Sequence, residues 1–370
     1  MVVNMNELKT NYQRAASAAK HSILRHPARS MAETLRRCAE RAEGFTSPDV
    51  YGAGELIEQF ETRIAKLLGK PAAIFLPSGT LAQPMALRIH AEQRTRTGVA
   101  LHPTSHLVLH EQNGYQQLWG LQGHQVGQPE KVLTIQDLKA CDSPERLGAL
   151  VLELPMREIG GQLPTWEELQ EQVAWAREHD LAVHLDGARL WQCEHYYQRS
   201  FAEICALFDS VYVSFYKDLG GIAGAVLAGA TEFVAQARVW SRRAGGNLIS
   251  MYPYVFAAEQ GLEENLSAMP EVARYAQELA PLLAKLPGVQ VNPTQPQAGM
   301  FHLHIEADEA TLIKAVTRYA EEHDVVVLPL PRAQHNGHCV CEIPLGRNAL
   351  QHSADFWQHH LSACLAILKK

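Results

Sequence analysis

Residues 181–189 read LAVHLDGAR, and residues 211–217 read VYVSFYK. In each stretch a short apolar run ends in a charged residue, Asp186 in the first and Lys217 in the second. Continuous apolar runs of this length are typical of strands that are buried on both faces of a parallel sheet. The loops at the carboxyl ends of such strands form the ligand crevice of an open α/β sheet. We therefore expect Asp186 and Lys217 to lie at the ends of neighbouring strands.

Asp186 and Lys217 have complementary chemistry. An aspartate can keep a pyridinium nitrogen protonated, and a lysine can form a Schiff base with an aldehyde. Taken alone, Asp186 could equally cap a helix. A lysine at the tip of a buried strand, however, must be paired or reactive. Together the two side chains indicate a site for pyridoxal 5′-phosphate.

A cradle for the phosphate of that cofactor is predicted at Ser78, Gly79 and Thr80. The three residues lie between an apolar run at 72–76, predicted to be a strand, and a predicted helix. Backbone N–H groups at the start of a helix bind anions, and glycine lets the backbone approach closely. By itself the tripeptide could be an ordinary turn with a helix cap.

Two groups of histidines raise the question of a metal site. His102, His106 and His110 are four residues apart, which on a helix would place them on one face. A preceding proline and the apolar run 107–109 favour a strand instead of a helix. Two roles then remain open for His106: an ordinary histidine that is hydrogen-bonded or faces solvent, or a ring that stacks on the cofactor. Residues 335–341 match no structural zinc spacing, and the Cys-Val-Cys within them predicts a half-buried strand. We expect no metal.

The chain divides into three predicted parts. Residues 1–45 read as a helical arm that could wrap a partner subunit. Residues 46–262 form a large domain, in which strands alternate with helices as in a parallel, helix-covered sheet. Residues 263–370 are predicted to form a smaller α+β domain.

The composition is that of a soluble, cytoplasmic globular enzyme. The 370 residues are 46% hydrophobic and 20% charged, and the net charge is −7, which provides no basic field for nucleic acid or an anionic membrane. The start of the chain lacks the layout of a signal peptide, and no apolar stretch approaches the roughly 20 residues of a membrane span. Seven scattered cysteines fit reduced thiols better than a disulfide framework.

The ordered series of motifs resembles the threonine aldolase and β-eliminating lyase family. The matching segments are DVYG at 49–52, GKPAAIFLPSGT at 69–80, SH at 105–106 with Glu111, HLDGAR at 184–189 and KDLG at 217–220. The resemblance implies a pyridoxal-phosphate enzyme of the aspartate-aminotransferase fold (fold type I), with a mostly parallel sheet in the large domain. It also implies a homodimer or homotetramer with shared active sites.

The resemblance further implies a role for each site residue. By this resemblance, Ser78, Gly79 and Thr80 would bind the phosphate, and His106 would stack on the cofactor ring. Asp186 would pair with the pyridinium nitrogen, and Lys217 would form the imine. Arg189 would contact the cofactor's phenolic oxygen and the substrate carboxylate. Lys217, His106 and Asp186 would be catalytic. The implied reaction is retro-aldol cleavage of a β-hydroxy-α-amino acid to glycine and an aldehyde. The alternatives are another amino-acid lyase reaction, such as β-elimination, and a cofactor-binding protein without turnover.

The chain departs from the family where substrate would be held. Residues 153–161 read ELPMREIGG and lack a histidine that the family often has there, so Arg157 or Glu158 is a candidate replacement. The family's small-domain arginine has no evident counterpart near residues 341–342. Arg189 is then the one matched candidate for the substrate carboxylate, and we expect threonine to be cleaved weakly.

Overall fold

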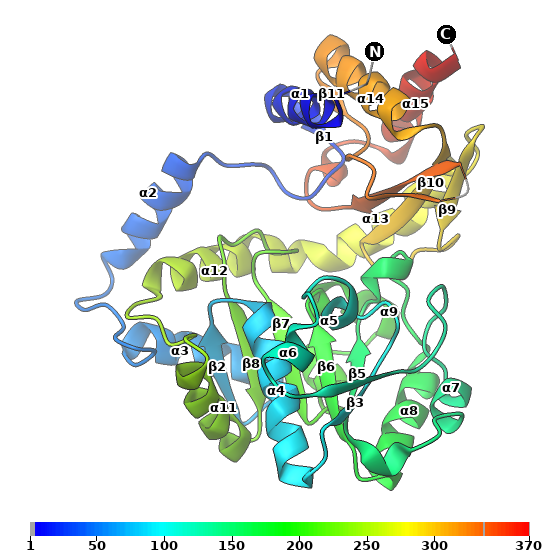
Figure 1. Cartoon of the computed structure of the whole chain (residues 1–370). Coiled ribbons are helices and arrows are strands. Elements are labelled where there is room, and N and C mark those ends of the chain that lie inside the picture. The colour runs from blue at the N-terminus through cyan, green and yellow to red at the C-terminus, as the bar shows by residue number, and fades with distance from the viewer. Residues whose placement is uncertain (1–3, 336, 370) are drawn as a thin grey trace. The chain divides into compact units, whose positions relative to one another are not determined.

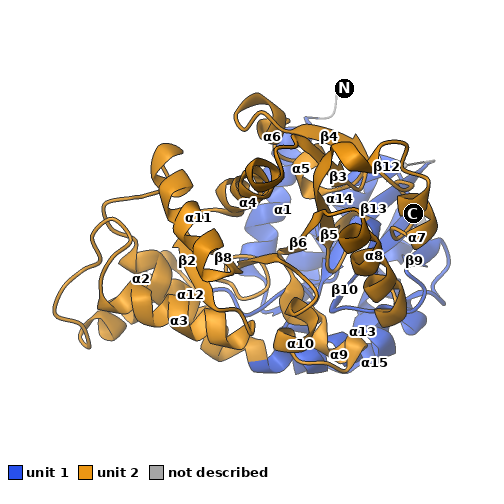
Figure 2. Cartoon of the chain, turned by 90° about the horizontal axis from the view of Figure 1, so that it is seen from below, with its two compact units in different colours: residues 1–28, 159–162, 267–370 blue, residues 29–158, 163–266 orange. Residues whose placement is uncertain are grey.

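The computed structural model describes residues 4–335 and 337–369, which fold into two compact units (Figure 2). We call residues 29–158 and 163–266 the large unit, and residues 1–28, 159–162 and 267–370 the small unit. The predicted domain boundaries after residues 45 and 262 stay predictions. None of the helices in the described residues combines the length and the apolarity needed to cross a membrane.

A seven-stranded sheet forms the centre of the large unit, with the strand order β2-β8-β7-β6-β5-β3-β4. The strands are β2 (Ala72–Leu76), β3 (Gly98–Leu101), β4 (Gln122–Gln125), β5 (Leu147–Glu153), β6 (Ala182–Gly187), β7 (Ser210–Ser214) and β8 (Ala225–Gly229). β4, β3, β5, β6 and β7 are mutually parallel, whereas β8 is antiparallel to both β7 and β2. β2 therefore runs in the same direction as the parallel strands.

Helices cover both faces of this sheet (Figure 1). They are α2 (Met31–Ala42), α3 (Glu55–Leu67), α4 (Gly79–Arg94), α5 (His106–Leu109), α6 (Gly114–Gln117), α7 (Ile135–Lys139), α8 (Trp166–Glu178), α9 (Glu194–Tyr197), α10 (Phe201–Cys205), α11 (Thr231–Arg243) and α12 (Tyr252–Asn265). α4 and α11 share one apolar core with Ile74 and Leu76 of β2. Phe75 alternates to the opposite face, where its ring centroid lies 5.6 Å from that of Phe60 on α3.

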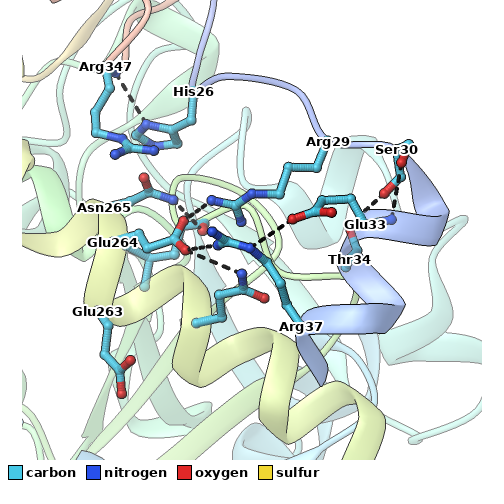
Figure 3. Close-up of polar contacts among 12 residues, drawn as sticks. His26, Arg29, Ser30, Glu33, Thr34, Arg37, Glu263, Glu264, Asn265 and Arg347 are labelled. Carbon is cyan, nitrogen blue, oxygen red and sulfur yellow. Dashed lines mark hydrogen bonds and ion pairs between the residues drawn. The ribbon is translucent and has the colours of Figure 1, made fainter. Parts of the chain in front are cut away.

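Helix α2 is held on α12 by ion pairs. Glu264 of α12 pairs with Arg29 and with Arg37, whose Nη1 lies 2.5 Å from Oε1 of Glu264 (Figure 3). One turn away, Arg41 pairs with Glu263. We refer to these five residues as the α2–α12 ion-pair cluster.

The small unit is built on a four-stranded antiparallel sheet with the order β12-β13-β10-β9. Its elements are α1 (Met5–Ala18), β1 (His21–Ser22), α13 (Met269–Leu283), β9 (Val289–Asn292), β10 (Met300–Glu306), α14 (Glu309–His323), β11 (Val325–Val326), β12 (Ala333–His335), β13 (His338–Pro344) and α15 (Ala354–Ala366). β1 pairs with β11, and Tyr12 on α1 donates a hydrogen bond to the carbonyl of Leu328 at 2.7 Å. The predicted arm thus contains two helices that belong to different units.

Most predicted elements are confirmed, and two predictions are wrong. The strand predicted at 107–109 is the one-turn helix α5, because the chain has already left the sheet at the end of β3 and the Ser105 carbonyl accepts from the N–H groups of Val108 and Leu109. The Cys-Val-Cys segment is a strand, but it is buried on both faces rather than half-buried. Asn336, within the segment 335–341, lies outside the described residues.

Candidate active site

The strand ends bring the predicted site residues together on one edge of the large sheet. β5, β6 and β7 end on the side where α5 lies (Figure 1). In the strand register Asp186 of β6 is opposite Glu153 of β5 and Tyr212 of β7. Lys217 follows the end of β7 by three residues. Because β2 runs in the same direction, its carboxyl end delivers Ser78 to the same edge.

The predicted phosphate cradle is the start of the 16-residue helix α4. Ser78 is extended and caps the helix, with its Oγ accepting a hydrogen bond from the N–H of Leu81 at 3.3 Å. A Cβ on Gly79 would lie 2.0 Å from the hydroxyl oxygen of Tyr212. Only glycine therefore fits between the helix start and β7. The free N–H groups and the dipole of α4 make this position suitable for an anion.

Asp186, which is buried, and Glu153, which is half-buried, carry carboxyl groups on adjacent strands. Asp186 is 2% exposed and accepts a hydrogen bond from the N–H of Ala188 at 3.1 Å. Burial, reinforced by the charge of Asp186, raises the pKa of Glu153. Glu153 in turn accepts the N–H of Arg157 at 3.0 Å. Two adjacent carboxylates cannot both ionise cheaply, so the proton resides on Glu153.

Lys217 lies in a setting that favours its neutral form. Burial lowers the pKa of Lys217, an effect that the charge of Asp186 partly offsets. Its Nζ lies 5.9 Å from the ring centroids of both Tyr212 and Tyr216. A neutral amine is the nucleophilic form of lysine, which is the form needed to attack an aldehyde.

Arg189 is held beside the loop that carries Lys217. It is 8% exposed, and its Nε lies 3.7 Å from Oδ1 of Asp218. The loops after β6 and β7 are joined by Trp191, whose indole N–H donates to the Ser214 carbonyl at 2.9 Å. Arg189 can therefore present its guanidinium next to Lys217.

His106 and Glu111 face each other above the strand ends. Nε2 of His106 lies 3.7 Å from Oε1 of Glu111, whose side chain is 2% exposed. Burial and then the nearby Lys217 lower the pKa of His106, so its imidazole is neutral. Burial and the charge of Asp186 raise the pKa of Glu111 to about 7. A neutral, planar imidazole is suited to stack on an aromatic cofactor.

The loop after β5 contacts α5. Oε1 of Glu158 lies 2.9 Å from Nε2 of His110 and 3.3 Å from Nη1 of Arg157. His102 is directed elsewhere, with one ring nitrogen 2.7 Å from the Thr104 hydroxyl. Among the residues that the structure describes, no group of histidine, cysteine and acidic side chains has the geometry of a metal site.

The sequence alone did not identify Glu111 and Glu153 as residues of the site. The signal that could have found Glu153 is its position at the end of the strand next to Asp186. Reasoning from the sequence also passed over Arg332 in the small unit, whose Nη1 lies 3.0 Å from Oε2 of Glu342. Arg332 directly precedes β12, which forms a hairpin with β13. Its pairing with Glu342 can be predicted only when the register of these two strands is known.

The residues present fit pyridoxal 5′-phosphate. The start of α4, where Gly79 lies close to β7, can bind the phosphate. The buried Asp186 can pair with a protonated ring nitrogen. Lys217 can reach an aldehyde as a neutral amine, and His106 offers a flat uncharged face. These four features lie on one edge of one sheet, and each supplies a different contact that the cofactor needs.

Comparisons with known proteins agree with this arrangement. The β-eliminating lyase family model matches residues 30–306. A solved structure from Listeria monocytogenes EGD-E, described as a "putative L-allo-threonine aldolase", is 37% identical with a TM-score of 0.89, over 96% of this chain and 99% of that one. The low-specificity L-threonine aldolase of Escherichia coli K12 is 28% identical over 66% of this chain and 72% of its own length.

A more distant structure shows the fold alone. An alanine–glyoxylate aminotransferase from Nostoc sp. is 12% identical with a TM-score of 0.69, over 94% of this chain and 95% of that one. The predicted aminotransferase-type fold, with its large mixed sheet and separate antiparallel sheet, is thus confirmed. Because the family model covers most of the sequence, from α2 to β10, this chain belongs to the β-eliminating lyase family, which includes the threonine aldolases.

Proposed function

We propose that this chain is a pyridoxal-phosphate-dependent aldehyde-lyase that cleaves a β-hydroxy-α-amino acid to glycine and an aldehyde. The observation that carries the proposal is the placement of the buried Asp186 and the half-buried Lys217 at the ends of adjacent strands beside the start of α4. The relatives named for L-threonine and L-allo-threonine support the reaction type.

Each predicted residue has a distinct task in this proposal. Ser78, Gly79 and Thr80 bind the phosphate with backbone and hydroxyl donors. Asp186 holds the ring nitrogen protonated, and its burial strengthens that ion pair.

The other residues act on the reacting part of the cofactor and on substrate. Lys217 would hold the cofactor through its aldehyde carbon. His106 lies against the ring, and Arg189 binds the substrate carboxylate. When bound, the cofactor supplies an electron sink for the bond that breaks at Cα.

The choice of the breaking bond depends on how substrate is oriented. The bond that lies perpendicular to the cofactor ring is the one that breaks, so the carboxylate contacts select the reaction. A single bidentate arginine contributes about 1.5–3 kcal/mol to holding that carboxylate. With Arg189 as the matched clamp, we expect substrates with larger β-substituents to gain orientation from their side chains.

We also propose a homo-oligomer in the cytoplasm. All seven cysteines are free thiols, six of them buried and two of these in β13, and reduced thiols are typical of that compartment. Sedimentation of the purified protein tests the oligomer and distinguishes a dimer from a tetramer.

The reaction is tested by incubating cofactor-loaded protein with L-threonine, L-allo-threonine and β-phenylserine and measuring glycine and aldehyde. We expect β-phenylserine to be preferred, with kcat/KM for both threonine isomers below about 10⁴ M⁻¹s⁻¹. Preferential release of ammonia and a keto acid would instead indicate β-elimination. Absence of any absorbance between about 320 and 430 nm after loading would refute dependence on the cofactor.

A further inference from the structure

Retro-aldol cleavage needs a base that the tasks above do not include. As the Cα–Cβ bond breaks, the substrate β-hydroxyl must lose its proton. Lys217 and Asp186 are committed to the cofactor, and Arg189 remains charged. The missing base must be reachable by substrate and must lie near the ring that faces the cofactor.

His110 meets both conditions. It is the residue directly after α5, four positions beyond His106, and the centroids of the two rings are 5.0 Å apart with a tilt of 39°. The side chain of His110 is 36% exposed, whereas that of Glu111 is 2% exposed. A substrate whose α-carbon lies over the cofactor beside His106 can therefore bring its β-substituent to His110, but not to Glu111.

The loop after β5 orients the His110 ring. Nε2 of His110 lies 2.9 Å from Oε1 of Glu158, and the same oxygen lies 3.3 Å from Nη1 of Arg157. The Glu158 side chain is 15% exposed, so this pairing is partly shielded from water. A carboxylate on Nε2 assigns the imidazole proton to that nitrogen and leaves Nδ1 as the acceptor. A base oriented by a carboxylate is a recurrent arrangement in enzymes.

The position of Glu158 follows from the strand that precedes it. Glu153 ends β5, and its carboxyl group accepts the N–H of Arg157 at 3.0 Å, which folds the loop back over the strand end. That turn directs both Arg157 and Glu158 towards α5. The stretch without the family's usual histidine therefore supplies the partner of a histidine on another element.

We propose that His110 is the catalytic base for the substrate β-hydroxyl and that Glu158 is its positioning residue. Nδ1 of His110 takes the hydroxyl proton, and the electron pair of the O–H bond becomes the second C–O bond of the aldehyde. The Cα–Cβ pair stays on Cα, which takes up a proton and leaves as glycine. His110 returns its proton to solvent or to Cα, so no oxidant or reductant is needed.

The other titratable groups around His110 are less suited to this task. His106 faces Glu111, and burial together with Lys217 lowers its pKa, which makes it a weak base. Glu111 is out of reach of substrate. Arg157 is a cation and cannot accept a proton, and its Nη1 lies 3.3 Å from Oε1 of Glu158.

The inference rests on the proposed function, and the test separates the two. Cofactor-loaded wild type, His110→Ala and Glu158→Gln are compared, with His124→Ala and Glu171→Gln as matched controls elsewhere on the large unit. For each protein we measure β-phenylserine cleavage, glycine affinity from the cofactor absorbance, and exchange of the glycine α-proton. Glycine has no β-hydroxyl, so its binding and exchange do not need the base.

For His110→Ala we expect kcat for cleavage to fall about 100-fold or more, with glycine affinity and exchange retained. Added imidazole should restore part of the cleavage rate, which a merely structural role would not allow. Glu158→Gln should show a smaller loss with an altered pH profile. Near-normal cleavage by His110→Ala, or a parallel loss of glycine exchange without imidazole rescue, would overturn the inference. A wild type that cleaves no β-hydroxy amino acid would overturn the proposed function as well.

Discussion

Two groups of charged side chains in the large unit are arranged in opposite ways. In the α2–α12 ion-pair cluster, Glu264 accepts hydrogen bonds from Arg29 and Arg37 (Figure 3). It also accepts one from the amide of Gln260. Its side chain is 23% exposed. At the strand ends, Asp186 is 2% exposed and accepts the N–H of Ala188. The first carboxylate has several partners near water, and the second is buried beside the titratable side chains of Lys217 and Glu153.

The difference separates charges that hold the fold from charges that do chemistry. Ion pairs close to water contribute little each, because solvent already stabilises the separate ions. Charges taken out of water cost several kcal/mol unless a ligand or partner compensates them. Changes at the strand ends should therefore alter function strongly, whereas changes in the cluster should alter stability slightly.

Lys217→Ala should have the largest effect, a complete loss of the reducible chromophore in a folded protein. Burial lowers the pKa of the Lys217 amine, and no side chain replaces it in the variant. Borohydride reduction of the loaded wild type followed by peptide mass spectrometry locates the label. Lys70 is a matched internal control, since burial lowers its pKa as well. A label on Lys70, or on any lysine other than Lys217, would contradict the assignment.

Asp186→Asn should come next, with a bound chromophore but rates reduced by about 10²-fold or more. The amide cannot keep the ring nitrogen protonated, while the start of α4 and Lys217 still bind the cofactor. The measurement is kcat for β-phenylserine together with the cofactor dissociation constant. Turnover near the wild-type rate in Asp186→Asn would show that its charge is not used.

The charged residues at the strand ends could be predicted from the sequence. A charged side chain at the end of a buried parallel strand has few possible roles other than pairing or catalysis. The apolar runs placed Asp186 and Lys217 at the ends of neighbouring strands from the sequence alone. The apolar run 107–109 was misread because three residues carry no period, and only the departure of the chain from β3 decides for a helix. The pairing of His110 with Glu158 joins residues 48 positions apart, so it depends on tertiary structure that no local pattern encodes.

Gly79→Ala should show a smaller effect, a weaker hold on the cofactor with some loss of stability. The new methyl group would meet the hydroxyl oxygen of Tyr212 at 2.0 Å, and overpacking of this kind costs about 1–3 kcal/mol. The cofactor dissociation constant and the thermal midpoint measure the two effects. Gly114→Ala is the matched control, because a Cβ there has no atom within 4 Å. If the two variants had the same cofactor dissociation constant and thermal midpoint, the close approach of α4 to β7 would not matter for cofactor binding or stability.

Glu264→Gln should have the smallest effect, about 1 kcal/mol of unfolding free energy with activity unchanged. Burial alone would raise the pKa of Glu264, but hydrogen bonds from Arg29 and Gln260 outweigh it and the pKa is lowered. A lowered pKa means that the stabilisation is present above the unfolded pKa of about 4.3 and is lost as the pH falls through the folded value. Denaturant unfolding at pH 7 should therefore distinguish wild type from Glu264→Gln, and the difference should shrink as the pH falls through the lowered pKa of Glu264. Glu40→Gln, which lies on α2 and is exposed, is the control. A large loss of activity in Glu264→Gln would mean that the cluster acts on the site, and the contrast between the two regions would fail.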